Sequence, residues 1–345
     1  MMKNSIRRRQ FIRTATAGSI GLGLVGKLLP INDISNMQSG RIGIIGLDTS
    51  HSIAFTKALN DPAAGPEFSG YRVVAAYPKG SIDIKSSTDR IPAYTEEVKK
   101  SGVEIVDSIE ELLPKVDFVL LETNDGRRHL EQALIVMKAG KRMFIDKPVA
   151  ASLSDTIAIF EAARKYNVAI FSSSSLRYIS GAKEISEGSA GKVLGADTYS
   201  PATLEKTHPD LFWYGVHGIE TLFTLMGTGC QRVSRTFTEN TDVVVGVWND
   251  DRIGTFRGTR SGKGGYGGTV FGEKGIIALG EYQGYNPLLM KIIEFFNTGV
   301  APVTAEETME IFTFMEAAEV SKQRGGIAVE MQEVLKKAQA EAKLI

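Results

Sequence analysis

The sequence predicts an α/β protein with an N-terminal doubly wound parallel sheet and a C-terminal α+β domain whose sheet is open and largely antiparallel. Its 345 residues suit two domains better than one. Short apolar runs alternate with helical stretches over residues 41–145, as in successive βαβ units. Over residues 193–280 the runs are β-branched or alternate between apolar and polar positions, which is typical of antiparallel strands.

The composition is that of a globular protein with no net charge. Hydrophobic residues make up 43% and charged residues 23% of the chain, which is ordinary for a soluble fold. Lysine plus arginine and aspartate plus glutamate both number 40, so the net charge gives no electrostatic basis for binding nucleic acid or an anionic membrane. Cys230 is the single cysteine, and no CxxC or Cys/His spacing is present. We therefore expect no disulfide within the chain and no metal site.

Residues 1–39 are typical of an export signal and linker. Arginines at Arg7 to Arg9 precede a weakly apolar, glycine-rich run from about Thr14 to Leu29, which is too short for a transmembrane span. The RRxFI pattern at Arg8 to Ile12 resembles a twin-arginine signal. We expect cleavage between about Pro30 and Gly40 and a periplasmic protein with no membrane span in its mature form. A disordered basic tail is the alternative.

The first domain, residues 40–150, opens with a predicted strand, turn and helix. The strand covers residues 41–47 (RIGIIGL), and the helix runs from about His51 to Leu59 with Asp48, Thr49 or Ser50 as its N-cap. Ligands of such Rossmann-type sheets bind at the carboxyl ends of the strands, where the strand order reverses. Further strands are predicted at residues 71–77, 103–106, 118–122 and 143–145, with helices at residues 95–101, 108–113 and 128–139.

The first turn is where a dinucleotide-binding sheet carries the pattern G-x-G-x-x-G. Only the first glycine is kept here, since the six positions are Gly46, Leu47, Asp48, Thr49, Ser50 and His51. The carboxylate of Asp48 stands where the backbone should approach a pyrophosphate, and would repel it unless it turns away to cap the helix. The acidic residue expected after the second strand is also missing, and Lys79 and Ser81 there suit a 2′-phosphate, which favours NADP. A strand-turn-helix unit that binds no nucleotide is the alternative.

Residues 117–148 (DFVLLETNDGRRHLEQALIVMKAGKRMFIDKP) carry a more specific pattern. The segment resembles the GFO/IDH/MocA (glucose–fructose oxidoreductase / inositol dehydrogenase) family, in which a strand, a helix ending in A-G-K and a second strand lead to an E-K-P motif. That motif is Asp146–Lys147–Pro148 here, and His129 matches the histidine that opens the helix. The resemblance implies that Lys147 lies between a nicotinamide ring and a substrate hydroxyl. It implies NAD or NADP as cofactor, held by Gly46, Leu47, Asp48, Thr49, Ser50, His51, Lys79, Thr123, Asn124, His129, Asp146 and Lys147.

A second match lies at residues 210–229 (DLFWYGVHGIETLFTLMGTG). His217 matches the family histidine on a helix that faces the nicotinamide. Glu220 follows at i+3, so it falls on the same helix face and is expected to orient the imidazole or raise its pKa. The family's aspartate four residues before the histidine is Trp213 here. The resemblance implies Lys147, His217 and Glu220 as the catalytic group, and it continues through residues 270–275 and 302–331.

The second domain, residues 151–345, is predicted to supply the substrate pocket. A helix at residues 154–167 and a strand at residues 168–171 lead to the segment SSSSLRY, where serine hydroxyls and Arg177 suit sugar hydroxyls or a phosphate. A polar loop with a capping serine is the alternative. Strands are predicted at residues 242–248, 253–260 and 267–271, and the glycine-rich residues 262–268 are interpreted as a flexible hairpin. The expected substrate residues are Arg177, Tyr178, Trp213, Tyr214 and His217.

The resemblance implies hydride transfer between a nicotinamide cofactor and a sugar, polyol or derivative. It also implies a homodimer or homotetramer formed through the C-terminal sheet, with the last helices returning to the first domain. Two other functions remain open. A non-catalytic sugar-binding protein with a degenerate nucleotide site would explain Asp48, His51, Pro78 and Trp213. An NAD-dependent enzyme that cleaves glycosides with a recycled hydride would show the same residues.

Overall fold

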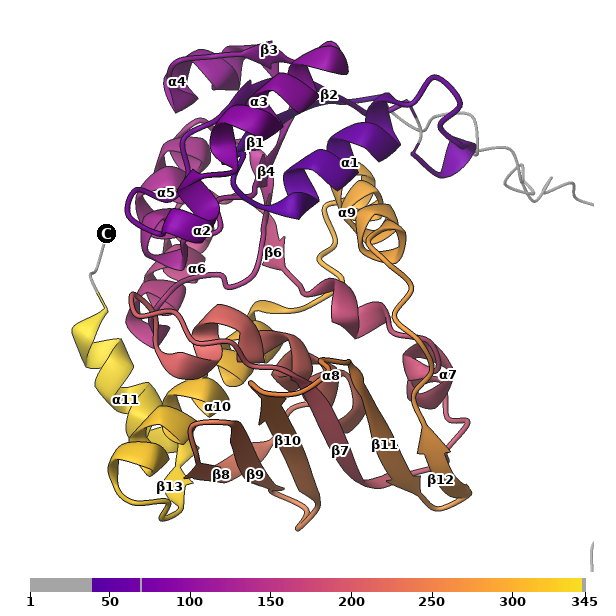
Figure 1. Ribbon diagram of the computed structural model, residues 1–345, viewed down its shortest axis with the longest axis vertical. Helices are drawn as coiled ribbons and strands as arrows, with labels where there is room; N and C mark the ends of the chain where they lie inside the picture. Colours follow the sequence, from indigo (N-terminus) through magenta and orange to yellow (C-terminus); the bar gives the residue numbers. More distant parts are fainter. Residues whose placement is uncertain (1–38, 69, 343–345) are drawn as a thin grey trace, which may run out of the picture. The chain divides into compact units, whose positions relative to one another are not determined.

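The structure is a computed structural model that describes residues 39–68 and 70–342. The predicted twin-arginine segment lies outside the described residues, so export stays a prediction. Within the described part of the chain, no helix has the length and apolar character needed to cross a bilayer. The described residues belong to one compact unit that contains two sheets (Figure 1).

The first sheet has six parallel strands in the order β3-β2-β1-β4-β5-β6. The order reverses between β1 and β4, so the carboxyl ends of these two strands form the expected binding edge. The predicted doubly wound parallel sheet is therefore confirmed. Its strands are β1 (Arg41–Ile45), β2 (Arg72–Tyr77), β3 (Glu104–Ile105), β4 (Phe118–Leu121), β5 (Arg142–Ile145) and β6 (Ile170–Ser172). Because β6 joins this sheet, the sheet extends beyond residue 150, where we expected the first domain to end.

Helices cover both faces of the first sheet. Apolar side chains of α1 and α9 pack on one face, and those of α4, α5 and α6 pack on the other. Such two-sided cover explains why the strands are continuous apolar runs. The helices of this layer are α1 (Ser50–Asn60), α2 (Lys85–Thr88), α3 (Ile91–Lys100), α4 (Ile109–Leu112), α5 (His129–Lys138) and α6 (Leu153–Tyr166).

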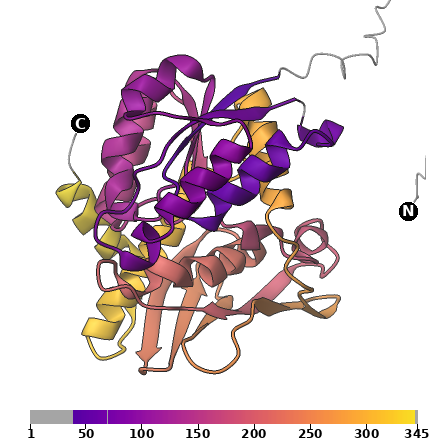
Figure 2. The same ribbon diagram turned by 45° about the horizontal axis from the view of Figure 1, so that its top comes forward.

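Helix α9 (Asn286–Thr298) belongs to this layer although it comes late in the chain (Figure 2). Its Phe295 packs against Phe171 of β6 at 4.8 Å between ring centroids, and Phe296 stacks on Phe118 of β4 at 4.7 Å. Each buried ring contributes roughly 1.5–3 kcal/mol to holding the helix on the sheet. We expected the return to the first domain within residues 302–331. Helix α9 already makes this return, and α10 (Ala305–Gln323) and α11 (Met331–Glu341) also contact α6 of this layer while they pack on the second sheet.

The second sheet has seven strands in the order β12-β11-β7-β10-β9-β8-β13. All its pairs are antiparallel except β7 with β10, so the sheet is mixed but mostly antiparallel, as expected. Because β7 lies between β10 and β11, residues 262–268 cross over a strand and do not form the predicted hairpin. The strands are β7 (Val193–Pro201), β8 (Cys230–Phe237), β9 (Thr241–Trp248), β10 (Ile253–Thr259), β11 (Gly267–Gly272), β12 (Gly275–Ala278) and β13 (Val329–Glu330).

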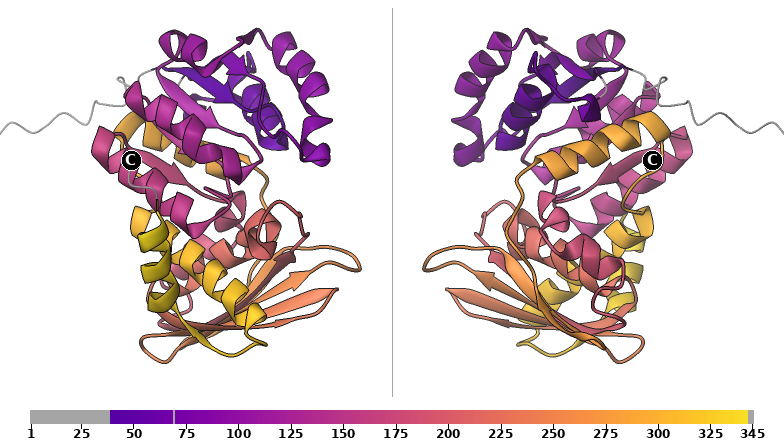
Figure 3. Two further views of the ribbon diagram at one scale, coloured as in Figure 1. Left: turned by 90° about the vertical axis from the view of Figure 1, so that its left-hand side faces the viewer. Right: turned by 90° about the vertical axis from the view of Figure 1, so that its right-hand side faces the viewer.

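Helix α8 (Val216–Met226) lies on one face of the second sheet, and a π-helical turn, Leu211–Gly215, leads into it. Gly218 allows the close approach, because a Cβ there would lie 2.3 Å from the ring of Phe256. Figure 3 shows this sheet with its helices on one side. The carboxyl edge of the first sheet and the first turns of α8 thus come together.

Candidate active site

A pocket of about 380 Å³ lies where the carboxyl edge of the first sheet meets α8. This volume lies within the range of small-molecule sites. The first domain lines it with Thr49, Ser50, His51, Ser86, Arg90, Asn124 and Lys147. The second domain lines it with Ser175, Leu176, Thr203, Trp213, Tyr214, His217, Tyr266, Tyr282 and Tyr285. The two walls therefore differ, since one is polar and cationic and the other is mostly aromatic.

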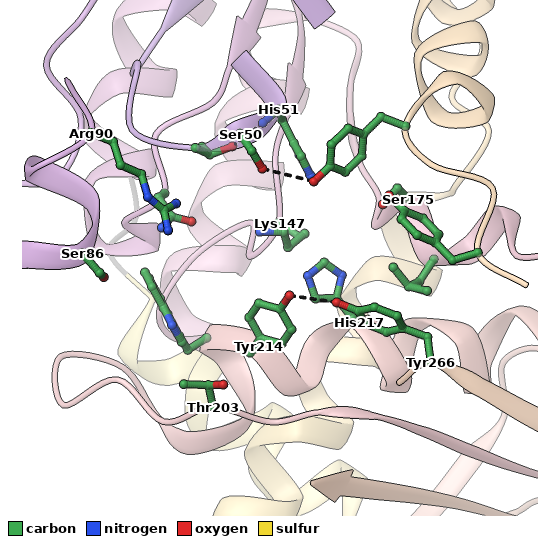
Figure 4. A pocket seen from close by; sticks show the side chains of 16 residues that line it. Ser50, His51, Ser86, Arg90, Lys147, Ser175, Thr203, Tyr214, His217 and Tyr266 are labelled. Carbon is green, nitrogen blue, oxygen red and sulfur yellow. Dashed lines mark hydrogen bonds between the residues drawn. The ribbon is translucent and has the colours of Figure 1, made fainter. Parts of the chain in front are cut away.

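Lys147 and His217 face each other across the middle of the pocket (Figure 4). Lys147 follows directly after β5 and Asp146, and its side chain is 10% exposed. Its ammonium lies 3.8 Å from Oδ2 of Asp146. His217 stands in the first turn of α8 and is 5% exposed. The sequence placed these two residues on separate domains, and the fold brings both to one cavity.

The His217 ring is held by Ser174. Its Nδ1 lies 2.6 Å from the Ser174 hydroxyl, which also accepts the backbone N–H of Leu176. Nε2 is then the nitrogen with no partner among the described residues. Burial lowers the pKa of His217 well below its usual value, and the neighbouring charges of Lys147 and His51 lower it further. The imidazole is therefore uncharged at neutral pH.

Glu220 does not touch His217, contrary to our expectation. Its carboxylate accepts hydrogen bonds from the Ser173 hydroxyl, the Ser174 backbone N–H and Nε of Arg177, at 2.8, 2.8 and 2.9 Å. Although His217 and Glu220 are three residues apart on one helix, the imidazole contacts the Ser174 hydroxyl and the carboxylate accepts the Ser174 N–H. Glu220 therefore acts on the imidazole only through the position of Ser174, and it does not raise the pKa of His217.

Arg177 and Tyr178 lie outside the pocket, so their prediction as substrate residues is wrong for this cavity. Arg177 is paired with Glu220 and with Glu307, at 2.9 and 2.7 Å. Both residues belong to a 3₁₀ turn, Ser175–Tyr178, that directs them toward a separate hollow beside α9. Ser175 of the same turn does line the pocket, where its hydroxyl pairs with Tyr282 at 2.9 Å.

Trp213 and Tyr214 line the pocket as expected, and three tyrosines that we did not predict join them. Tyr214 and Tyr266 share a hydrogen bond of 2.9 Å between their hydroxyls, and Tyr285 bonds Ser50 across the cavity at 3.1 Å (Figure 4). Tyr266 is the lone aromatic residue in the glycine-rich residues 262–268, which was the one available signal for its role.

The turn after β1 explains how a carboxylate is tolerated at the second glycine position. Gly46 has a φ of +90°, and a Cβ there would lie 2.5 Å from the Thr123 backbone nitrogen, so only glycine fits. Thr49 caps α1 by accepting the His51 N–H at 2.9 Å. Asp48 is fully buried and points away from the pocket, toward the loops after β2 and β4.

The Asp48 carboxylate is satisfied inside the protein. Oδ2 accepts the backbone N–H and the hydroxyl of Ser81 at 2.7 and 2.6 Å, and Oδ1 accepts the Asn124 N–H at 3.0 Å. Ser81 is therefore engaged and does not serve a 2′-phosphate as we expected. Lys79 is exposed and does not line the pocket. The negative charge of Asp48 does not face the cavity, which removes the expected repulsion of a phosphate.

Two more of the predicted cofactor residues are structural. His129 is fully buried, and its ring nitrogens contact the carbonyls of Val149 and Thr123 at 3.1 and 2.6 Å. Thr123 is also buried and packs on Gly46. Neither side chain lines the pocket. They hold the loop after β4 in place.

The residues that remain fit a phosphate-bearing cofactor on the first-domain wall. Hydroxyls of Ser50 and Ser86 and the guanidinium of Arg90 reach the cavity beside the N-terminus of α1 (Figure 4). The amide of Asn124 lines the same wall. Hydrogen-bond donors and a helix N-terminus suit a pyrophosphate, and Arg90 adds a positive charge in place of the missing glycine contacts. We did not predict Arg90 or Ser86, because nothing in the local pattern marks them.

His51, Glu122 and Asp146 come together behind this wall. Nδ1 of His51 lies 3.0 Å from Oδ1 of Asp146 and 3.9 Å from Oε2 of Glu122. Burial and the neighbouring Asp146 raise the pKa of Glu122 well above its usual range. Burial also opposes ionisation of Asp146, but His51 and Lys147 outweigh it and hold the pKa of that carboxyl below its usual value.

Residues 41–174 match the family model of GFO_IDH_MocA, described as "Oxidoreductase family, NAD-binding Rossmann fold". Residues 41–174 are therefore similar to the NAD-binding domain of this family. A similar curated protein is the 1,5-anhydro-D-fructose reductase of Ensifer adhaerens, which is 32% identical over 123 residues. That alignment covers 34% of this chain and 36% of the reductase, about a third of each protein.

Solved structures share the fold over most of the chain. A probable dehydrogenase from Thermotoga maritima is 21% identical with a TM-score of 0.70, over 85% of this chain and 99% of that one. The scyllo-inositol dehydrogenase of Lactobacillus casei, solved with NAD(H) and scyllo-inositol, is 16% identical with a TM-score of 0.66, over 86% and 100%. At these identities the likeness establishes the two-domain fold of the described residues.

Proposed function

We propose that this protein is an NAD(P)-dependent oxidoreductase that acts on a sugar, a polyol or a derivative by hydride transfer. One observation carries the proposal. Lys147 of the first domain and the uncharged His217 of the second face each other in one pocket, between a wall that suits phosphate and a wall of aromatic rings. The NAD-binding family of the first domain supports the choice of cofactor.

The cofactor, when bound, supplies the hydride acceptor or donor. Arg90, Ser86 and Ser50 would hold its phosphates on the first-domain wall. Gly46 gives the tight turn that brings the N-terminus of α1 to the same wall. Because Asp48 is satisfied internally, no carboxylate of this turn opposes the phosphates.

His217 takes the proton of the reacting hydroxyl. In the tautomer that carries its proton on Nδ1 and donates it to Ser174, the lone pair of Nε2 is free to accept a proton from substrate. Glu220 positions Ser174 through its backbone N–H and so fixes the ring orientation. The Lys147 ammonium stabilises the alkoxide that develops as the proton leaves. Lys147 and His217 are thus the catalytic residues, and Glu220 is a positioning residue.

The aromatic wall selects a carbohydrate-like substrate. Trp213, Tyr214, Tyr266, Tyr282 and Tyr285 offer ring faces for the apolar C–H surfaces of a sugar and hydroxyls for its polar groups. The residues that line the pocket include no aspartate or glutamate that could pair with a cationic substrate. The lining therefore favours neutral sugars and polyols.

The direct test is a substrate screen with the purified protein. Sugars, inositols and their keto derivatives are offered with each of NAD⁺, NADP⁺, NADH and NADPH, and the reduced nucleotide is followed by absorbance. We expect turnover of at least one compound, which Lys147→Met lowers sharply. Release of a leaving group from a glycoside without net nucleotide change would assign the glycoside-cleaving reaction instead. Binding of sugars without either reaction would favour a binding protein.

We propose further that the protein is periplasmic and forms homodimers through the open face of its second sheet. The RRxFI segment supports the first point. The strand register places Tyr199, Ile253, Phe271 and Ile276 on one face, where they are 46%, 53%, 38% and 70% exposed. Such an apolar patch is typical of a protein–protein interface. Light scattering after gel filtration tests the dimer, with Ile253→Glu expected to give monomers.

A further inference from the structure

Three ionisable side chains meet behind the cofactor wall, from three different elements. His51 lies in the first turn of α1, Glu122 directly follows β4, and Asp146 directly follows β5. They are 5%, 0% and 0% exposed. One ligand-type atom from each lies within 4.8 Å of the others. The cluster therefore sits at the carboxyl edge of the sheet, where His51 lines the pocket and the two carboxylates are buried behind it.

The carboxylates of this cluster lack the donors that buried carboxylates need. Both oxygens of Glu122 and Oδ2 of Asp146 accept no hydrogen bond from any described residue. The nearest cation, Lys147, stands 3.8 Å from Oδ2 of Asp146 and is shared with the pocket. Elsewhere in the site, Asp48 and Glu220 each receive three hydrogen bonds. Two buried carboxylates with so few donors call for a bound positive charge.

We propose that His51, Glu122 and Asp146 bind a divalent transition-metal ion, Zn²⁺ or Mn²⁺. One imidazole nitrogen and two carboxylate oxygens suit these ions better than Mg²⁺ or Ca²⁺, which prefer oxygen ligands alone. In four-coordinate zinc, ligands at about 2.1 Å from the metal lie about 3.4 Å apart. The His51 separations of 3.0 and 3.9 Å bracket that distance.

The ion would join α1 to the ends of two strands and leave Lys147 to the pocket. His51 occupies the third glycine position of the nucleotide turn. Where a glycine would have no side chain, the imidazole of His51 reaches toward the sheet and contacts Asp146. A cation on Asp146 replaces Lys147 as the partner of that carboxylate, so the ammonium serves the substrate. We expected no metal site, because the sequence has no CxxC or Cys/His spacing. The three ligands are 71 and 24 residues apart along the chain and form no local spacing pattern.

The first test is metal content. Tag-free protein, purified without chelators, is analysed by inductively coupled plasma mass spectrometry. We expect about one equivalent of zinc or manganese per chain. After chelator treatment, adding ZnCl₂ or MnCl₂ should raise the melting temperature by at least about 5 °C, because an ion that binds only the folded state stabilises it. Protein that holds less than a tenth of an equivalent and shows neither a thermal shift nor calorimetric binding of either ion overturns the proposal.

The second test separates a metal from a proton. Glu122→Gln keeps the shape of a protonated glutamate but removes a metal ligand. We expect its metal affinity to fall at least about 100-fold, with the far-ultraviolet circular dichroism unchanged. The matched control is Glu310→Gln, a half-buried glutamate that accepts the N–H groups of Gly229 and Cys230 far from the cluster, and it should bind metal like the wild type. Unchanged metal affinity in Glu122→Gln would overturn the site assignment.

Discussion

The two walls of the pocket handle charge in different ways. Behind the first-domain wall, Asp48, Glu122 and Asp146 are fully buried carboxylates, and Lys147 and Arg90 carry positive charge to the surface. The second-domain wall offers rings, hydroxyls and an imidazole that burial keeps uncharged. The altered glycine turn therefore places no negative charge in the cavity. The one carboxylate of that turn, Asp48, lies behind the wall, where Ser81 and Asn124 donate to it.

Among the residues of the first-domain wall, we expect the largest effect on activity at Lys147. Lys147→Met keeps the length of the side chain but removes the charge that stabilises an alkoxide, and we expect kcat/KM to fall about 10³-fold. Steady-state kinetics with the substrate found in the screen measures this loss. Lys79→Met is the control, because Lys79 is exposed and does not line the pocket. Equal activity of the two variants would remove Lys147 from the mechanism.

On the second-domain wall, the residue proposed to take part in proton transfer is His217. His217→Asn removes the general base and should lower kcat about 10²-fold. Only the uncharged imidazole accepts a proton, and burial lowers the pKa of His217. The wild-type kcat/KM should therefore stay constant as pH falls through about 6.5, the usual imidazole value, and decline only at lower pH. A decline centred at or above the usual value would contradict an uncharged, buried base.

The internal bonding of Asp48 is tested through stability. Asp48→Ala leaves buried N–H groups of Ser81 and Asn124 without acceptors, so we expect the free energy of unfolding to fall by about 2–4 kcal/mol. Urea denaturation measures it. Asp83→Ala is the matched control, because Asp83 is exposed and its pair with Arg127 should contribute at most about 1 kcal/mol. Equal losses of unfolding free energy in the two variants would mean that Asp48 does not hold the loops after β1, β2 and β4 together.

The smallest effect is expected at Arg90. Arg90→Gln removes one charge from the proposed phosphate site, and the KM for the nucleotide should rise about 5–10-fold with kcat little changed. Arg72→Gln, on the exposed start of β2, is the control. A fall in kcat without a change in KM would place Arg90 at the reacting centre and not at the phosphates.

Local patterns predicted the elements of the first sheet and the two residues that face each other in the pocket. Apolar runs of strand length predicted the strands. The DKP and VHGIE segments were sufficient to single out Lys147 and His217 as site residues. The pattern could not show that the 3₁₀ turn directs Arg177 away from the cavity, since that depends on Glu220 and Glu307 as partners.

Contacts between distant segments were also beyond the sequence. Tyr285 reaches the pocket because α9 returns to the first sheet, and Arg90 does so because of the short helices after β2. The burial of Asp48 rests on Ser81 and Asn124, which lie 33 and 76 residues away. The cluster of His51, Glu122 and Asp146 forms only when the strand ends meet.

Fluorescence titration shows whether this pocket holds a nicotinamide cofactor, as we propose. Trp213 lines the pocket, and the other of the two tryptophans, Trp248, is buried in the second sheet. We predict that NADH or NADPH quenches the tryptophan emission in a saturable way, and that Trp213→Phe abolishes most of the quenching. Saturable quenching lost in Trp213→Phe would support the account. The absence of quenching and of any calorimetric binding with all four nucleotide forms would contradict it.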